Sequence, residues 1–246
     1  MYEIEIKSLL GSKERADELK RLLVQLFPAL KVLPPHKQRN HYFNAPSDLR
    51  QFAGAVQHLL SPEKQEELSH ILRKVKENVS IRTRDADGKV FVILKASIGD
   101  DSSANGVSRI EFECVIAPTE DGRDCGTANA AHANKIRRPQ TLEELDKLLL
   151  DAGLTYQAKW SREREHYDLG SIHITVDRNA GYGYLAEFEK MIDDGREAEY
   201  AKQELKALMA TLGCQELAQD RLERMFKYYN EHWEEYYGTD RVFVVE

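Results

Sequence analysis

Charged residues alternate with apolar ones in several short stretches of the sequence, and the charges within a stretch are often of one sign. The first stretch, MYEIEIK, places Glu3, Glu5 and Lys7 on alternate positions, with Ile4 and Ile6 between them. Side chains alternate across a strand, so the three charged groups share one face if this stretch is a strand. Closely spaced carboxylates suit hard divalent cations, and clustered guanidiniums suit polyanions.

The same alternation recurs along the chain and yields two sets of charged positions. The acids are Glu3, Glu5, Glu111, Glu113, Asp177, Glu187 and Glu189. The bases are Lys7, Arg82, Arg84, Lys95, Arg109, Arg162 and Arg164. Exposed sheets usually mix signs across neighbouring strands, because like charges two positions apart repel. The segregation therefore favours a metal at one wall and phosphate at another over the simpler interpretation that these faces are only solvated.

These charges need strands to position them, and the pattern predicts both strands and helices. Alternating segments predict strands over 1–7, 37–45, 79–97 (with a hairpin turn at Asp87-Gly88), 108–116, 158–169, 171–177 and 184–191. Apolar spacing of three and four predicts helices over 12–27, 141–154, about 197–212 and 215–237. Pro34-Pro35 is expected to end the first strand-helix unit, and residues 117–138 are expected to form a long mobile loop.

A closed antiparallel barrel reconciles these faces, since its charged side can line a wet interior while its apolar side packs outward against helices. The predicted fold class is therefore α+β, an eight-stranded antiparallel β-barrel (tunnel) with a hydrophilic lumen, surrounded by helices. No linker clearly divides the chain. We expect a single domain over 1–246, with a helical insertion at 46–78 and C-terminal helices at 196–237.

Composition restricts the partners of the protein. The formal net charge of -7 argues against nonspecific nucleic-acid binding, and the apolar runs are too short to span a membrane. Three scattered cysteines (Cys114, Cys125 and Cys214) without CxxC spacing predict a reduced, cytoplasmic chain. The expected partner is a small molecule, and the expected state is a monomer or homodimer.

The ordered set of charged motifs, from residue 3 to residue 189, resembles the CYTH or triphosphate tunnel metalloenzyme superfamily. That superfamily includes thiamine triphosphatases, inorganic triphosphatases and class IV adenylyl cyclases. Its motifs match Glu3/Glu5/Lys7, Arg82/Arg84, Lys95, Arg109/Glu111/Glu113, Arg162/Arg164/Tyr167, Asp177, Gly181/Gly183 and Glu187/Glu189. One departure is Arg162, where the family often has a lysine that helps to deprotonate water. Arginine stays protonated and is a poor base.

The resemblance implies that the seven acids form a pool of ligands for Mg²⁺ or Mn²⁺ and that the seven bases bind a triphosphate-containing small molecule. It implies metal-dependent hydrolysis of inorganic tripolyphosphate or of an organic or nucleoside triphosphate, with catalytic roles for Glu5, Lys95 and Arg162. Two alternatives stay open. One is a class IV adenylyl cyclase that makes cyclic AMP from ATP, and the other is a noncatalytic polyphosphate- or nucleotide-binding tunnel.

Overall fold

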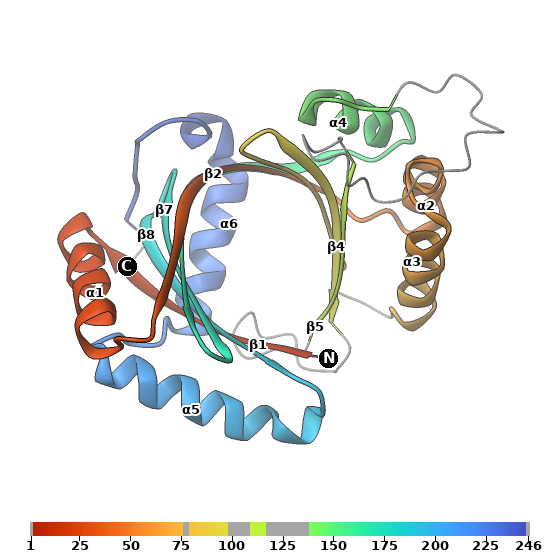
Figure 1. The fold of residues 1–246 in the computed structure, drawn as a ribbon. Coiled ribbons are helices and arrows are strands. Elements are labelled where there is room, and N and C mark those ends of the chain that lie inside the picture. Colours follow the sequence, from red (N-terminus) through yellow and green to blue (C-terminus); the bar gives the residue numbers. More distant parts are fainter. Residues whose placement is uncertain (1, 76–78, 98–108, 117–137, 245–246) are drawn as a thin grey trace. The chain divides into compact units, whose positions relative to one another are not determined.

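The computed structural model describes residues 2–75, 79–97, 109–116 and 138–244, and Figure 1 shows its ribbon. The strands are β1 (Tyr2–Gly11), β2 (Lys31–Phe43), β3 (Val79–Ala86), β4 (Lys89–Ser97), β5 (Arg109–Val115), β6 (Tyr156–Leu169), β7 (Ile172–Asn179) and β8 (Gly183–Ile192). The helices are α1 (Lys13–Leu26), α2 (Arg50–Val56), α3 (Pro62–Lys74), α4 (Leu142–Asp151), α5 (Ala198–Thr211) and α6 (Gln219–Tyr236). Two short 3₁₀ turns are η1 (Gln57–Leu59) and η2 (Gly195–Glu197).

The strand order is cyclic. The strands are hydrogen-bonded in the order β1-β5-β4-β3-β2-β6-β7-β8, and β8 also pairs with β1. Within the described residues, the strand pairs β1–β5, β1–β8, β2–β3, β3–β4, β6–β7 and β7–β8 are antiparallel. The predicted α+β fold with an eight-stranded antiparallel sheet is confirmed.

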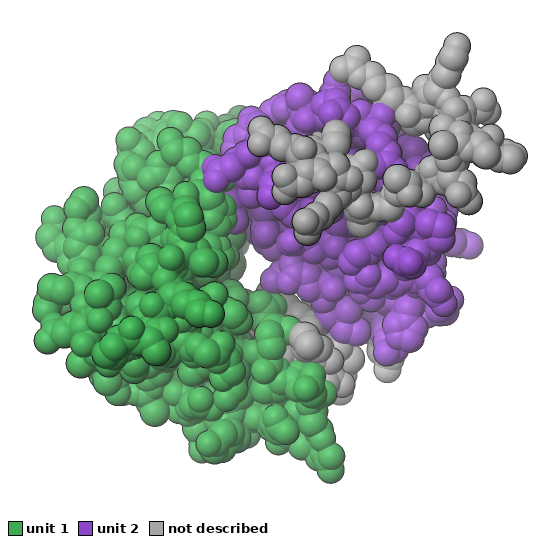
Figure 2. All heavy atoms as spheres, in the orientation of Figure 1, with its two compact units in different colours: residues 1–37, 99–109, 160–246 green, residues 38–98, 110–159 purple. Residues whose placement is uncertain are grey.

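Two compact units make up the chain, and Figure 2 colours them separately. Unit 1 contains residues 1–37, 99–109 and 160–246, and unit 2 contains residues 38–98 and 110–159. Each unit combines segments that are distant in sequence. The single domain over 1–246, with its additions at 46–78 and 196–237, stays a prediction.

The core of unit 1 lies between strands β1, β7 and β8 and helices α1 and α5. Helix α1 starts where the Ser12 hydroxyl accepts the backbone N–H of Arg15, and it buries Leu19 and Leu23. Ile6 is fully buried in this core with Phe188 of β8. Burial of such a side chain contributes roughly 2 kcal/mol. The apolar positions of β1 therefore face the helices, as the alternation predicts.

The core of unit 2 lies between strands β3, β4 and β5 and helices α2, α3 and α4. Phe112 of β5 and Ile81 of β3 are fully buried there. The β3–β4 hairpin turns at Asp87 and Gly88, whose φ angles of 49° and 84° are both positive. Two such residues in succession form the turn whose twist suits a hairpin, so the predicted hairpin is confirmed.

Several boundaries differ from the prediction. Strand β2 begins at Lys31 and runs through Pro34 and Pro35, both of which are exposed. Proline is tolerated in a strand at positions where no N–H donor is needed. Helix α6 ends at Tyr236 and has a non-helical residue, His232, near its end. Residues 117–137 of the predicted loop lie outside the described residues.

Cys214 is a buried free thiol. The expected reduced state of the chain stays a prediction. Cys125 lies outside the described residues. Among the helices in the described ranges, none is long and apolar enough to cross a membrane.

Candidate active site

The charged face of unit 1 is built by strands β6, β7, β8 and β1, which are paired in that order. Glu5 is paired with Glu189 and Lys7 with Glu187 across β1 and β8. Arg164 of β6 is paired with Asp177 of β7. Directly opposed residues in an antiparallel ladder point to the same side, so these groups share one face. Because Ile4 and Ile6 alternate with them, burial of the isoleucines against the helices fixes the charged groups on the other side.

Three of the predicted metal ligands come together on this face. Glu3, Glu5 and Glu189 each offer a carboxylate oxygen, and these oxygens all lie within 4.8 Å of one another. Glu5 is buried, and the other two are half-buried. Three converging carboxylate oxygens fit a hard divalent cation, which prefers oxygen ligands and retains positions for water or phosphate. The donor set present therefore fits Mg²⁺ or Mn²⁺.

The bases of the same face are paired with acids. Lys7 forms ion pairs with Glu5 and, at 3.2 Å, with Glu187. Arg164 donates from Nε and Nη2 to the two oxygens of Asp177, at 2.7 and 2.6 Å, and also pairs with Glu187. Arg162 donates to Asp177 at 2.8 Å. Asp177, which is fully buried, thus accepts hydrogen bonds from two guanidiniums.

These contacts shift the ionisation of the buried groups. Burial alone would raise the pKa of Glu187, but the charges of Lys7 and Arg164 outweigh it and hold that pKa well below its usual value. Burial alone would lower the pKa of Arg164, but Asp177 and Glu187 outweigh it and raise that pKa. The buried acid and base are therefore both charged at neutral pH.

The charged face of unit 2 is built by β2, β3 and β4, with acids from β5. Arg82 and Arg84 share a face of β3, and Lys95 of β4 lies on the same side through its pairing with Ser80. Lys95 is 2.9 Å from Glu111, and Arg84 is 3.3 Å from Glu113.

The acid of this second cluster is also held ionised. Burial alone would raise the pKa of Glu111, but the charges of Lys95 and Arg82 outweigh it and lower that pKa. Unit 2 thus presents a cluster of bases in which acids offset part of the positive charge.

Two polar residues of this face were missed by the sequence analysis. Tyr42 accepts a hydrogen bond from Arg82 Nη1 at 2.8 Å, and Asn40 accepts one from Arg84 Nε at 2.9 Å. Both lie on β2 directly opposite the arginines that they contact. The signal was the alternation of Gln38, Asn40 and Tyr42 in KQRNHYFNA, which places polar groups on one face of the predicted strand.

The remaining predicted site residues are less closely defined. Arg109 lies opposite Glu3 in the β1–β5 pairing, but its side chain is outside the described part of the structure. Glu111 and Glu113 belong to unit 2 and contact its bases, whereas the acid trio Glu3, Glu5 and Glu189 belongs to unit 1.

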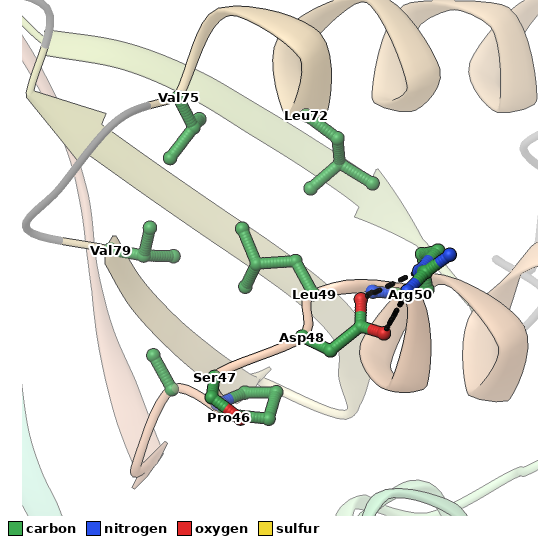
Figure 3. Close-up of a pocket in the computed structure, with 9 residues that line it drawn as sticks. Pro46, Ser47, Asp48, Leu49, Arg50, Leu72, Val75 and Val79 are labelled. Carbon is green, nitrogen blue, oxygen red and sulfur yellow. Dashed lines mark hydrogen bonds and ion pairs between the residues drawn. The ribbon is translucent and has the colours of Figure 1, made fainter.

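A pocket of about 440 Å³ lies elsewhere in unit 2, and Figure 3 shows its lining. Leu72, Val75 and Val79 supply apolar surface, while Asp48 and Arg50 are paired with each other at 2.7 Å. None of the predicted site residues lines this pocket. Its charged groups neutralise one another, so we do not regard it as the candidate site.

In each unit, a strand ladder presents carboxylates and cationic groups on one of its faces. The fold and these two charged faces define the class of protein. Comparison with protein families identifies the class. A CYTH domain model matches residues 1–221, and the chain belongs to the CYTH domain family. The comparison with curated proteins found no match.

Solved structures share this fold at low sequence identity. The PH1819 protein of Pyrococcus horikoshii OT3 is 19% identical with a TM-score of 0.56, and the match covers 95% of this chain and 99% of that one. A Vibrio parahaemolyticus protein named as a candidate adenylate cyclase is 14% identical with a TM-score of 0.54, covering 92% of this chain and 98% of that one. The PH1012 protein of P. horikoshii OT3 is 16% identical with a TM-score of 0.54, and the match covers 88% of this chain and 96% of that one.

Proposed function

We propose that the protein is a divalent-metal-dependent triphosphatase that hydrolyses tripolyphosphate or an organic or nucleoside triphosphate. One observation carries the proposal. The oxygens of Glu3, Glu5 and Glu189 converge on the strand face that also bears Lys7, Arg162 and Arg164. A cation site beside a cluster of fixed positive charges is what a metal–polyphosphate complex requires. Membership of the CYTH family supports the same conclusion.

The acid trio would hold Mg²⁺ or Mn²⁺. When bound, such an ion lowers the pKa of a coordinated water and neutralises phosphate charge. The other acids of the predicted pool are Glu111, Glu113, Asp177 and Glu187, and all four contact basic side chains. We propose that the first role of these four acids is to hold those bases in place.

The bases would bind phosphate oxygens. Lys7, Arg162 and Arg164 do so in unit 1, and Arg82, Arg84 and Lys95 in unit 2, with Arg109 as a further proposed contact. Guanidiniums match phosphate in bidentate geometry. Because Arg162 stays protonated, it binds and orients the substrate and does not remove a proton from water. Polyphosphate must displace the internal acids from these bases, so binding exchanges one set of charge pairs for another.

The direct test is turnover of tripolyphosphate and ATP with Mg²⁺ or Mn²⁺, and with chelator as the control. We expect metal-dependent release of orthophosphate. Glu5→Gln should lower turnover by roughly 100-fold while the thermal unfolding curve shows a folded protein. Glu163→Gln is the matched control, because Glu163 is an exposed residue on the opposite face of β6. Undiminished turnover in E5Q would refute the role of the trio.

A class IV adenylyl cyclase is the second candidate, because the V. parahaemolyticus neighbour with this fold carries an adenylate cyclase name. The same assay separates the two. Cyclic AMP and pyrophosphate from ATP would identify a cyclase, whereas tight binding of tripolyphosphate without turnover would identify a noncatalytic binding protein.

A further inference from the structure

A buried polar cluster lies behind the arginines of unit 2. Asp146 of α4 is 1% exposed and accepts hydrogen bonds from the Thr83 hydroxyl at 2.5 Å and the Tyr156 hydroxyl at 2.7 Å. Oδ2 of Asp146, the oxygen that Tyr156 contacts, also lies 2.5 Å from Nδ1 of His41, which is 2% exposed. An ionised carboxylate can only accept, so Nδ1 of His41 carries the proton. One carboxylate therefore joins α4 to three strands.

Asp146 is an exception on its own helix. Helix α4 buries Leu142, Leu145 and Leu149 on one face, and Asp146 lies on that same face. Burial alone would raise the pKa of Asp146, but the hydrogen bonds from His41, Thr83 and Tyr156 outweigh it and lower that pKa. A buried carboxylate is costly unless it is fully hydrogen-bonded, so each of the three donors matters to the cluster.

The register connects this cluster to the arginines. In the β2–β3 ladder, His41 is paired with Thr83. The pairs on either side are Tyr42 with Arg82 and Asn40 with Arg84. Successive pairs point to opposite faces, so the tethered pair faces α4 while its two neighbours face the other way. In both neighbouring pairs the β2 residue hydrogen-bonds the arginine.

We propose that Asp146 is a positioning residue for the Arg82–Arg84 pair, acting through Thr83 and His41 to fix the β2–β3 ladder that aims both guanidiniums. The proposal rests on the proposed function, because the guanidiniums are then the groups that bind a polyphosphate. Ladder hydrogen bonds fix the register of the two strands but allow local twisting. A buried side-chain anchor on the central pair restrains that twist, and a restrained pair of cations loses less entropy when it binds an anion.

The test compares Thr83→Val with Thr83→Ser. Valine keeps the β-branched shape but removes the hydroxyl donor, whereas serine restores it. Ser61→Ala is the matched control, since Ser61 is a buried residue of unit 2 that caps α3 and lies outside this ladder. Asp146→Asn is a second variant that keeps the shape of the carboxylate and removes its charge. Binding of inorganic tripolyphosphate is measured by calorimetry, and kcat and KM are measured alongside.

We expect T83V to weaken tripolyphosphate binding by about tenfold, with kcat changed less than KM. D146N should weaken binding in the same direction, T83S should bind like the wild type, and S61A should lower thermal stability without changing binding. If T83V bound tripolyphosphate within twofold of S61A, the positioning role would be overturned, because the Thr83 hydroxyl would then contribute to stability alone.

A second measurement separates this proposal from the proposed function. The Nε–Hε groups of Arg82 and Arg84 are followed by NMR without substrate, with Arg82→Lys and Arg84→Lys used for assignment. We expect both groups to be ordered in the wild type and more mobile in T83V. If the wild type fails to bind tripolyphosphate, the proposed function fails, and unchanged arginine mobility in T83V would overturn the positioning role on its own.

Discussion

Replacement of Arg164 by methionine removes the central cation of the unit 1 cluster while keeping most of the length of the side chain. Arg164 is 7% exposed and is bonded to Asp177 and Glu187. After the substitution, Asp177 would keep the bond from Arg162 at 2.8 Å, and Glu187 would keep Lys7 at 3.2 Å. Each of the two buried acids would then have lost one of its positively charged partners.

The size of the effect follows from burial. Loss of one partner of a buried ion pair costs about 3–5 kcal/mol when the other charge is left uncompensated. Because Asp177 and Glu187 each keep one cation, we expect R164M to lie at the lower end of that range. That is a large part of a typical unfolding free energy of about 5–15 kcal/mol. Arg178 provides the matched control on the neighbouring strand. Its side chain is 42% exposed and is 2.7 Å from Asp240, so Arg178→Met should cost only about 0–1 kcal/mol.

The assay is urea unfolding followed by circular dichroism, with the free energy of unfolding compared between R164M and R178M. The double variant Arg164→Met with Glu187→Gln should recover about 1 kcal/mol, because one buried acid that has lost a cationic partner is then removed. Equal small losses in R164M and R178M would refute the reasoning, since they would show that the Arg164 cluster behaves like a solvated surface.

Two further predictions concern acid stability and the glycine turn between β7 and β8. The pKa of Glu187 lies below its ordinary 4.5, so its ion pairs stabilise the fold above that pH and are lost as the pH falls through the lower, folded-state pKa. The melting temperature should be flat near neutrality and fall in acid, and Glu187→Gln should reduce the fall; identical profiles would contradict this. Gly181→Ala should cost more than about 2 kcal/mol in urea unfolding, because φ is +94° and the new Cβ would lie 2.6 Å from the Tyr229 ring. Gly11→Ala, at φ +72° in open space, should cost about 1 kcal/mol, and equal costs would remove the role of the Tyr229 contact.

Local pattern predicted much of the fold. Alternation of charged and apolar residues assigned Ile4 and Ile6 to the core and Glu5 to the opposite face, because a strand places successive side chains on opposite sides. The hairpin at Asp87-Gly88 was equally local. Strand β2 was predicted too short, because proline lacks the N–H that a paired strand position needs. The sequence does not show that Pro34 and Pro35 occupy positions where this N–H is not needed.

Contacts between distant residues needed the tertiary structure. The pattern in the sequence named the acids and bases but could not pair Arg164 with Asp177 and Glu187, nor separate the acid trio of unit 1 from the acids of unit 2.

The sequence by itself determined which residues are charged, which strand face carries them and the family to which their order belongs. Only the tertiary structure decided which charges meet. Asp146 lies 63 residues from Thr83 and 105 from His41, and its place in the apolar stripe of α4 identifies neither partner. The physical reason is that the period of a strand or helix is set by its own backbone, whereas the partner of a buried charge is set by strand register and packing.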